Sequence, residues 1–147
     1  MLLPNTLPPR HCLYRVPFTQ KAELKRQIDE LLAAGHIERA RSPFGVGVLF
    51  VEKHDKYLRL CVDCRRLNTI TVKDVYPTPR VDVSIDKMNG ATFFEKMGLR
   101  SGFYQIRVAP EDVHKTAFHT EWGSFQWLVM LIGLTNAPTI FKMEQWT

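Results

Sequence analysis

The sequence predicts a mixed α+β fold, and three patterns along the chain carry that prediction. Apolar residues recur at helical spacing in one early segment, between residues 24 and 32. Two later stretches, 46–63 and 116–129, each pair two runs of apolar and β-branched residues around a short turn, which is typical of hairpins. Helices and hairpins mixed along one chain in this way favour the α+β class.

The first eighteen residues are predicted to form an extended strap. They contain four of the nine prolines, Pro4, Pro8, Pro9 and Pro17. Proline fixes φ, lacks a backbone donor and disfavours a helical conformation in the residue before it. A helix is therefore expected only after this segment.

A helix is predicted to begin at Thr19, whose hydroxyl suits an N-cap, and to end at Gly35, which suits the left-handed residue after a last turn. Its apolar positions share one face: Leu24, Ile28, Leu31 and Leu32. Its other face carries two i, i+4 charge pairs, Lys25 with Asp29 and Arg26 with Glu30. Such a charged face is typical of a solvated surface.

The middle of the chain is predicted to contain a hairpin, a linker, a short helix and a strand. Residues 46–53 and 57–63 form the hairpin, and the Pro-rich residues 76–79 form the linker. A short helix with Val81, Ile85 and Met88 on one face ends at Gly90. A strand over 92–97 then ends at Gly98.

The last part of the chain is predicted to form a second hairpin and the start of a helix. Residues 116–120 and 125–129 flank the turn Trp122-Gly123-Ser124. Thr135-Asn136-Ala137-Pro138 combines capping residues with an early proline, which indicates a helix N-terminus.

The composition bounds the function only loosely. A chain of 147 residues is long enough for one domain, or for part of a larger one. The net charge of +5 suits a polyanionic partner such as nucleic acid. No apolar run approaches the length of a membrane span and no signal-peptide core is present, so an intracellular protein without a membrane partner is expected.

The three cysteines are Cys12, Cys61 and Cys64. An odd number argues against a disulfide framework. Cys61 and Cys64 have zinc-type spacing, and His11 with Cys12 would complete four ligands. A second well-spaced pair is missing, so reduced thiols in or beside a strand are the favoured interpretation.

Basic residues crowd the first predicted hairpin and the turn after it: Lys53, His54, Lys56, Arg59, Arg65 and Arg66. Guanidinium and ammonium groups pair strongly with phosphate oxygens, so this group predicts a phosphate clamp. Composition alone favours a different interpretation, a solvated charged strand edge that prevents aggregation.

Several motifs resemble the reverse transcriptases of gypsy-class long-terminal-repeat retrotransposons. Residues 58–68, Leu-Arg-Leu-Cys-Val-Asp-Cys-Arg-Arg-Leu-Asn, resemble the fingers motif of that family. Residues 92–105 resemble the strand and turn that carry its first metal-binding aspartate. Other blocks follow in family order at 42–45, 76–80, 115–118 and 133–138.

The resemblance covers about residues 13 to 147 and implies part of a right-hand polymerase, the fingers with an incomplete palm. The boundaries it implies are a strap at 1–18, fingers at 19–72, the first part of the palm at 73–105, the second part of the fingers at 106–136 and the start of a truncated palm helix at 137–147. Residues 128–132 are then expected to form an exposed apolar patch open to self-association, and 125–147 to be the least protected region.

Three residues match positions that bind the incoming nucleotide in the family. Lys53 and Arg59 match fingers residues that hold its triphosphate. Phe103 matches the aromatic residue that lies under the sugar and excludes a ribose 2′-hydroxyl. Periodicity alone leaves open that Phe103 is an ordinary core aromatic residue.

Three more residues match the nucleic-acid side of the family's site. Arg65 and Asn68 match positions near the template and the junction of fingers and palm, and Arg66 belongs to the same basic group. The resemblance thus implies an RNA or DNA template–primer and deoxynucleotides as partners.

The sequence departs from the family pattern where the metal chemistry belongs. Gly98 occupies the position of the first metal-binding aspartate, and the chain contains no Asp-Asp pair to supply the other two carboxylates. Leu131-Ile132 replaces the Pro-Phe that precedes Gly133 in the family. The intact family uses Mg²⁺, which carboxylates and substrate phosphates bind, so no catalytic or metal-binding residue is predicted in this chain.

Three functional hypotheses therefore stay open. The chain is a piece of an RNA-directed DNA polymerase that is inactive alone, a remnant that binds nucleic acid or nucleotide without catalysis, or a decayed element fragment without a role.

Overall fold

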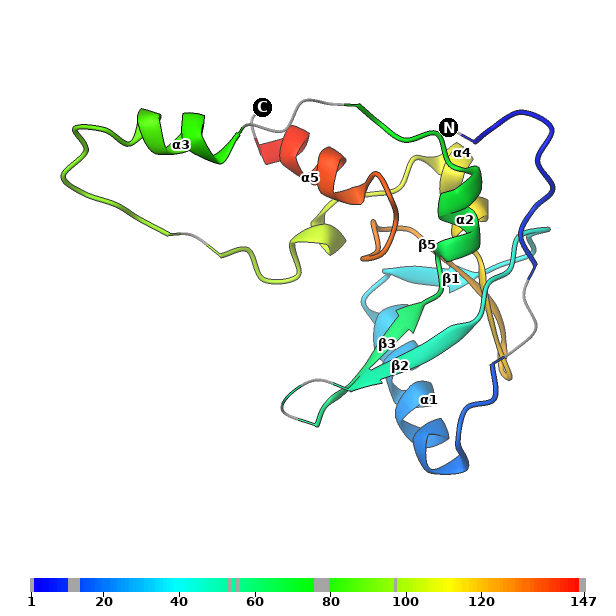
Figure 1. Cartoon of the computed structure of the whole chain (residues 1–147). Coiled ribbons are helices and arrows are strands. Elements are labelled where there is room, and N and C mark those ends of the chain that lie inside the picture. The colour runs from blue at the N-terminus through cyan, green and yellow to red at the C-terminus, as the bar shows by residue number, and fades with distance from the viewer. Residues whose placement is uncertain are drawn as a thin grey trace.

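The computed structural model describes residues 2–10, 14–52, 54, 56–75, 80–96 and 98–145, and these confirm the α+β class (Figure 1). The helices are α1 (Phe18–Ala33), α2 (Arg65–Ile70), α3 (Val81–Lys87), α4 (Pro110–Val113), α5 (Ala137–Gln145) and the 3₁₀ turns η1 (Gly102–Gln105) and η2 (His114–Thr116). The strands are β1 (Ile37–Arg39), β2 (Val48–Glu52), β3 (Leu58–Val62), β4 (Phe118–Thr120) and β5 (Gly123–Trp127). No helix in these ranges is long and apolar enough to cross a membrane.

Helix α1 ends as predicted but begins differently. Gly35 has φ +67°, its amide donates to Leu32, and the amide of His36 donates to Leu31, which together form a Schellman C-cap. The prediction of Thr19 as N-cap is wrong, because the helix already begins at Phe18. Pro17 precedes it in extended conformation and accepts from the third amide of the helix without any side-chain cap.

Strand β5 lies at the centre of a three-stranded antiparallel sheet in the order β1-β5-β4. The predicted hairpin at 116–129 is confirmed as β4 and β5, with Phe118 opposite Phe125. Strand β1 was not predicted, because Ile37-Glu38-Arg39 is short and mostly charged. Only its pairing with β5, with Ile37 opposite Trp127, makes it a strand.

The predicted hairpin at 46–63 is confirmed as the two-stranded sheet of β2 and β3. Its register runs from Val48 opposite Val62 to Glu52 opposite Leu58. Apolar side chains on one face of β3 pack against the main core together with residues of α1. Helix α2 follows β3 directly.

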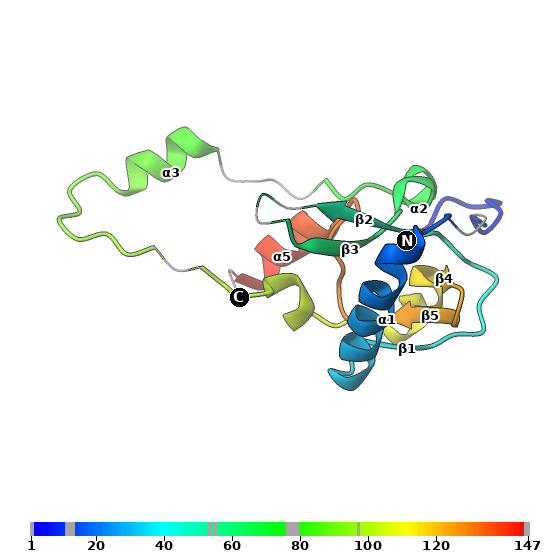
Figure 2. The ribbon, with the colours of Figure 1, turned by 90° about the horizontal axis from the view of Figure 1, so that it is seen from below.

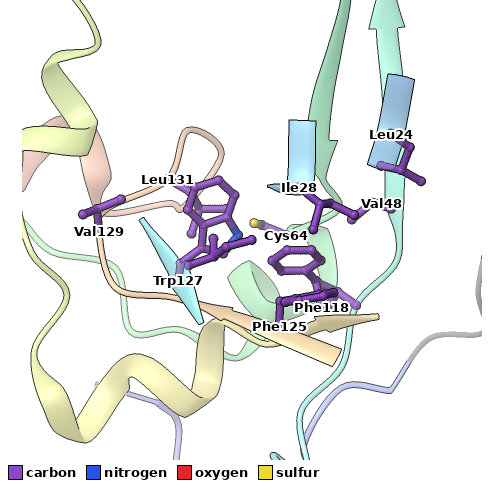
Figure 3. Close-up of a cluster of buried hydrophobic side chains, with 11 residues drawn as sticks. Leu24, Ile28, Val48, Cys64, Phe118, Phe125, Trp127, Val129 and Leu131 are labelled. Carbon is purple, nitrogen blue, oxygen red and sulfur yellow. The ribbon is translucent and has the colours of Figure 1, made fainter. Parts of the chain in front are cut away.

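The core lies where α1, β2 and the three-stranded sheet meet, and Figure 3 shows its main members. Phe118, Phe125 and Ile28 are its largest fully buried side chains. Their side chains fill the space between α1 and the sheet. Cys64 and Leu131 belong to the same buried cluster.

The prediction of an exposed apolar patch at 128–132 is wrong. Val129, Met130 and Leu131 are each at most 4% exposed, and only Ile132 projects into solvent, at 57%. The segment is buried because its backbone is paired on both sides: Leu128 donates to His36 and accepts from Val108, and Met130 donates to Ile106. This burial argues against the expectation that 125–147 is the least protected region, which stays a prediction for hydrogen exchange.

A run of exposed apolar side chains lies on an arm, the described residues 80–96 and 98–100, which extends away from the core in both views (Figures 1 and 2). The short helix is confirmed as α3, with Gly90 at φ +82° after it. The predicted strand over 92–97 is wrong for the described residues 92–96, which are irregular, and Met97 lies outside the described residues. A strand needs a backbone partner, and no described strand pairs with this segment.

Residues 2–10 run extended apart from a turn at Asn5, as predicted for this part of the strap. Leu3 donates a backbone hydrogen bond to Ile70, and Pro9 accepts one from Gly45. The predicted strap ended at residue 18, but Phe18 already belongs to α1, and 11–13 lie outside the described residues. The predicted terminal helix is α5, with Pro138 in its first turn. The Asn136 side chain bonds to the backbone of residues 72 and 74.

Candidate functional site

A cleft of about 820 Å³ opens between α1, β3, η1 and the segment after β5. Two residues predicted to bind nucleotide, Arg59 and Phe103, line it from opposite elements. Leu131 and Ile132, the pair that departs from the family pattern, line it as well. The fold thus brings Arg59 to the same cleft as Leu131 and Ile132, which lie more than seventy positions later in the sequence.

Arg59 lies on β3 opposite Val51 of β2, and its side chain is exposed. Its charge is close enough to favour the ionised forms of Cys61 and Tyr104. Burial of both groups outweighs that effect, so the pKa of each is raised overall. The guanidinium therefore faces a cleft whose other side is partly apolar.

Phe103 lies on η1, and α5 holds it in place. Its ring centroid is 4.9 Å from that of Phe141. The preceding residue, Gly102, is buried, and a Cβ atom there would lie 2.7 Å from Cζ of Phe141. A side chain at residue 102 would therefore require the Phe141 ring to move.

The floor of the cleft is aromatic, which the sequence analysis missed. Tyr104 stacks at a tilt against His36 at 4.9 Å and against Trp127 at 5.6 Å. The indole nitrogen of Trp127 is buried without a hydrogen-bond partner. The signal available in the sequence was the neighbouring pair Phe103-Tyr104, which places two aromatic residues at one site.

The described lining of the cleft lacks donors suited to a divalent metal ion. Glu30 is the one acidic residue in that lining, and its carboxylate already pairs with Arg26. No group of three His, Cys, Asp or Glu side chains occurs among the described residues. A Cβ atom at Gly98 would have no other described heavy atom within 4 Å beyond its chain neighbours. The described lining of the cleft therefore does not offer the carboxylates that hold Mg²⁺.

Arg65 lies at the start of α2, outside the lining of the cleft, and is held by Asp63. Its guanidinium donates to both carboxylate oxygens, at 2.9 and 2.7 Å, and Tyr14 donates to the same carboxylate at 2.7 Å. These contacts hold the pKa of Asp63 well below its usual range. The Arg65 side chain remains 81% exposed, so it can still contact an anion.

The other predicted residues are placed differently. Arg66 is exposed and donates to the backbone oxygen of Arg10 at 3.3 Å. The Asn68 amide donates to the oxygen of Gly133 at 2.8 Å and accepts from the nitrogen of Thr135 at 2.9 Å. Lys53 lies outside the described residues.

The two described cysteines are free thiols in apolar surroundings. Cys61 is half-buried on β3 and Cys64 is buried in the core. Burial raises the pKa of the Cys64 thiol to about 12, which disfavours the thiolate that zinc requires. His11 and Cys12 lie outside the described residues.

Comparison with known proteins places these features in a family. Residues 51–144 match the family model described as "Reverse transcriptase (RNA-dependent DNA polymerase)". The chain is 39% identical over 134 residues to the "Retrovirus-related Pol polyprotein from transposon opus" of Drosophila melanogaster, covering 88% of this chain and 13% of that protein. It is 49% identical over 84 residues to an "RNA-directed DNA polymerase homolog" of Oenothera berteroana, covering 57% of this chain and 59% of that protein.

Solved structures share the fold. The native prototype foamy virus protease–reverse transcriptase matches with a TM-score of 0.79 at 22% identity, over 96% of this chain and 19% of that chain. The foamy viral enzyme in complex with an RNA/DNA hybrid matches with a TM-score of 0.77 at 20% identity, over 98% and 20%. This chain corresponds to about a fifth of those chains. Arg59 and Phe103, which both line the cleft, lie within residues 51–144 that match the family model.

Proposed function

Because the chain belongs to the reverse transcriptase family, in the form found in retrotransposon Pol polyproteins, we propose that it binds nucleotide phosphates and nucleic acid but does not polymerise DNA by itself. One observation carries the proposal. Arg59 and Phe103 converge on a cleft in which the acidic lining residue, Glu30, is already paired with an arginine.

The division of the chain into fingers and palm is part of this proposal. Residues 19–72 and 106–136 supply the fingers, since α1 and strands of both sheets share one hydrophobic cluster, and α2 packs beside them in a second cluster with Phe44 and Ala117. Residues 73–105 and 137–147 supply the beginning of the palm, and 1–18 form a strap. The long arm at 80–100, which extends away from that core, supports the boundary (Figure 2).

The cleft suits a deoxynucleoside triphosphate. Arg59 supplies a guanidinium for phosphate oxygens, and Phe103 offers an aromatic face on the opposite wall for the sugar. Lys53 would add a second cation from the same hairpin. Ile132 gives the remaining wall an exposed apolar side chain in place of the family's phenylalanine.

The exposed arginines outside the cleft suit a template–primer. Arg65 and Arg66 follow each other at the start of α2 and are both exposed, and Asn68 lies one turn further on. The foamy viral relatives have been solved with double-stranded DNA and with an RNA/DNA hybrid. We place the nucleic acid that this chain binds along α2.

Polymerase chemistry does not follow from binding. Polymerases of this family use Mg²⁺ to activate the attacking oxygen and to neutralise the leaving pyrophosphate. The described donors do not fit such an ion, and the sequence contains no Asp-Asp pair. The chain should therefore be inactive alone.

Primer extension tests the inactivity. Purified chain with a primer–template, deoxynucleotides and Mg²⁺ or Mn²⁺ is expected to give no product above a no-protein control. Gly98→Asp should fold normally, because open space surrounds residue 98, and should still be inactive. Extension by the unmodified chain would overturn this part of the proposal.

Salt titration tests the binding. If about four phosphates are neutralised, the log–log slope of affinity against salt on duplex DNA should be roughly −4, at ~0.9 per contact. The double variant Arg59→Ala/Arg65→Ala should bind more weakly with a shallower slope. Lys21→Ala/Lys25→Ala removes the same charge from α1 and is the matched control. Equal loss in both variants would show that binding reflects net charge alone.

A self-association surface completes the proposal. The arm exposes a run of apolar side chains, namely Val81, Val83, Ile85, Met88, Phe93, Phe94 and Leu99. Surfaces of this kind mark contacts with other protein. In the isolated chain we assign this contact to a second copy.

A further inference from the structure

Gln27 is a buried polar residue of α1, only 8% exposed, that the proposed function leaves without a role. Its side-chain nitrogen donates to the backbone oxygen of Leu58 at 2.6 Å. Its side-chain oxygen accepts from the backbone nitrogen of Leu60 at 3.0 Å. The amide therefore binds the backbone of β3 on both sides of Arg59.

This contact completes the hydrogen bonding of β3. In an antiparallel strand, alternate residues direct their backbone groups to opposite edges. Arg59 pairs with Val51 of β2 on one edge, so the oxygen of Leu58 and the nitrogen of Leu60 face the other edge, toward α1. No third strand lies there in the described sheet. One amide, with one donor and one acceptor, satisfies both groups as a neighbouring strand would.

Neighbouring contacts hold the amide in place. Glu23 accepts the second hydrogen of the Gln27 nitrogen at 2.6 Å and also binds Arg26. Arg26 in turn donates to the hydroxyl of Tyr57, the residue before β3, at 3.1 Å. Helix α1 therefore binds the start of β3 twice: Arg26 contacts Tyr57, and Gln27 contacts the backbone of Leu58 and Leu60.

We propose that Gln27 is a positioning residue for Arg59: by fixing the backbone at Leu58 and Leu60, it aims the guanidinium into the cleft. This inference rests on the proposed function, in which Arg59 binds phosphate. Without the amide, the outer edge of β3 has two unsatisfied groups and the strand can twist or fray. The guanidinium then samples orientations that miss the anion, and affinity falls although no charge has been removed.

The test is a double-mutant cycle with inorganic triphosphate as the probe. Gln27→Met keeps the side-chain volume and removes the hydrogen bonds with Leu58 and Leu60 together with the one to Glu23. It is expected to weaken triphosphate binding about tenfold, the equivalent of one hydrogen bond lost. In an Arg59→Ala background, Gln27→Met should cause no further loss, since the group it positions is absent. Gln126→Met, on the exposed face of β5, is the matched control and should bind like the unmodified chain.

Gln27→Glu gives a second, independent readout. At neutral pH a carboxylate can accept from Leu60 but cannot donate to Leu58, so binding should be weak. A protonated carboxyl group can do both, so the affinity relative to the unmodified chain at the same pH should recover on acidification. This variant also serves if Gln27→Met does not fold.

The outcomes separate the two proposals. Failure of the unmodified chain to bind triphosphate would overturn the proposed function together with this inference. Binding by the unmodified chain that Gln27→Met leaves unchanged, or that it weakens equally with and without Arg59, would overturn this inference alone.

Discussion

Asn68 shows how a side chain expected at a nucleic-acid surface can be engaged within the fold. The resemblance places it near the template, yet its amide joins α2 to the loop before α5 through Gly133 and Thr135. Both contacts join segments more than sixty residues apart. The amide therefore connects two parts of the chain that share no secondary structure.

Asn68→Ala should accordingly lower stability by about 1–2 kcal/mol, because it leaves one backbone donor and one acceptor without a partner. Urea unfolding followed by circular dichroism measures this. Asn89→Ala, at the exposed end of α3, is the control and should change stability by at most about 0.5 kcal/mol. Unchanged stability in Asn68→Ala with weakened nucleic-acid binding would instead support a direct contact.

At the scale of elements, the contact between α1 and β3 involves the ionised carboxylate of Glu23. Arg26 and Gln27, which both donate to its carboxylate, lower the pKa of Glu23 from 4.5 to about 2. A carboxyl group whose pKa is depressed in the folded state stabilises that state fully above its unfolded pKa. The stabilisation is lost as the pH falls from about 4.5 toward 2.

Glu23→Gln should therefore lower the urea midpoint near pH 6 and flatten its fall between pH 4.5 and 2. The slope due to Asp63, whose pKa is also lowered, should remain in both proteins. Glu52→Gln, at the exposed end of β2, controls for the loss of one negative charge. An unchanged pH profile in Glu23→Gln would show that the contact between α1 and β3 does not depend on this carboxylate.

At the scale of the whole molecule, the arm at 80–100 is the feature in which this chain differs from a closed globular domain. Phe93 and Phe94 are 93% and 69% exposed, and α3 buries none of its residues. Few buried contacts imply rapid local opening. The arm, and not the region after residue 125, is the part of the chain with the least packing.

Amide hydrogen exchange should accordingly be fast throughout 80–96 and slow in β5. Slow exchange of 92–96 in a monomer would show that the arm folds back onto its own chain.

Phe93→Ser/Phe94→Ser should shift the chain toward the monomer in sedimentation velocity at matched concentration. Phe18→Ser removes a phenylalanine of similar exposure, 87%, from α1 and should not change the association state.

The sequence by itself determined the elements whose signals are local. Three such signals act on neighbouring residues only. They are the glycine at the end of α1, the runs of apolar and β-branched residues in β2–β3 and β4–β5, and the proline in the first turn of α5. That the metal carboxylates are absent was an expectation from the family resemblance, which assigns the first aspartate position to Gly98. The sequence itself shows only a glycine there and no Asp-Asp pair. The assignment of Arg59 and Phe103 to one nucleotide site likewise followed from the family resemblance and not from the pattern of residues.

Only the tertiary structure decided which surfaces are covered. Strand β1 exists because β5 pairs with it, residues 129–131 are buried because backbone pairs flank them, and 92–96 form no strand because no partner lies beside them. By its spacing Gln27 lies on the apolar face of α1, between Leu24 and Leu31, and only the position of β3 gives its amide two backbone partners. Backbone hydrogen bonds and burial join residues far apart in the sequence, so no local pattern can specify them.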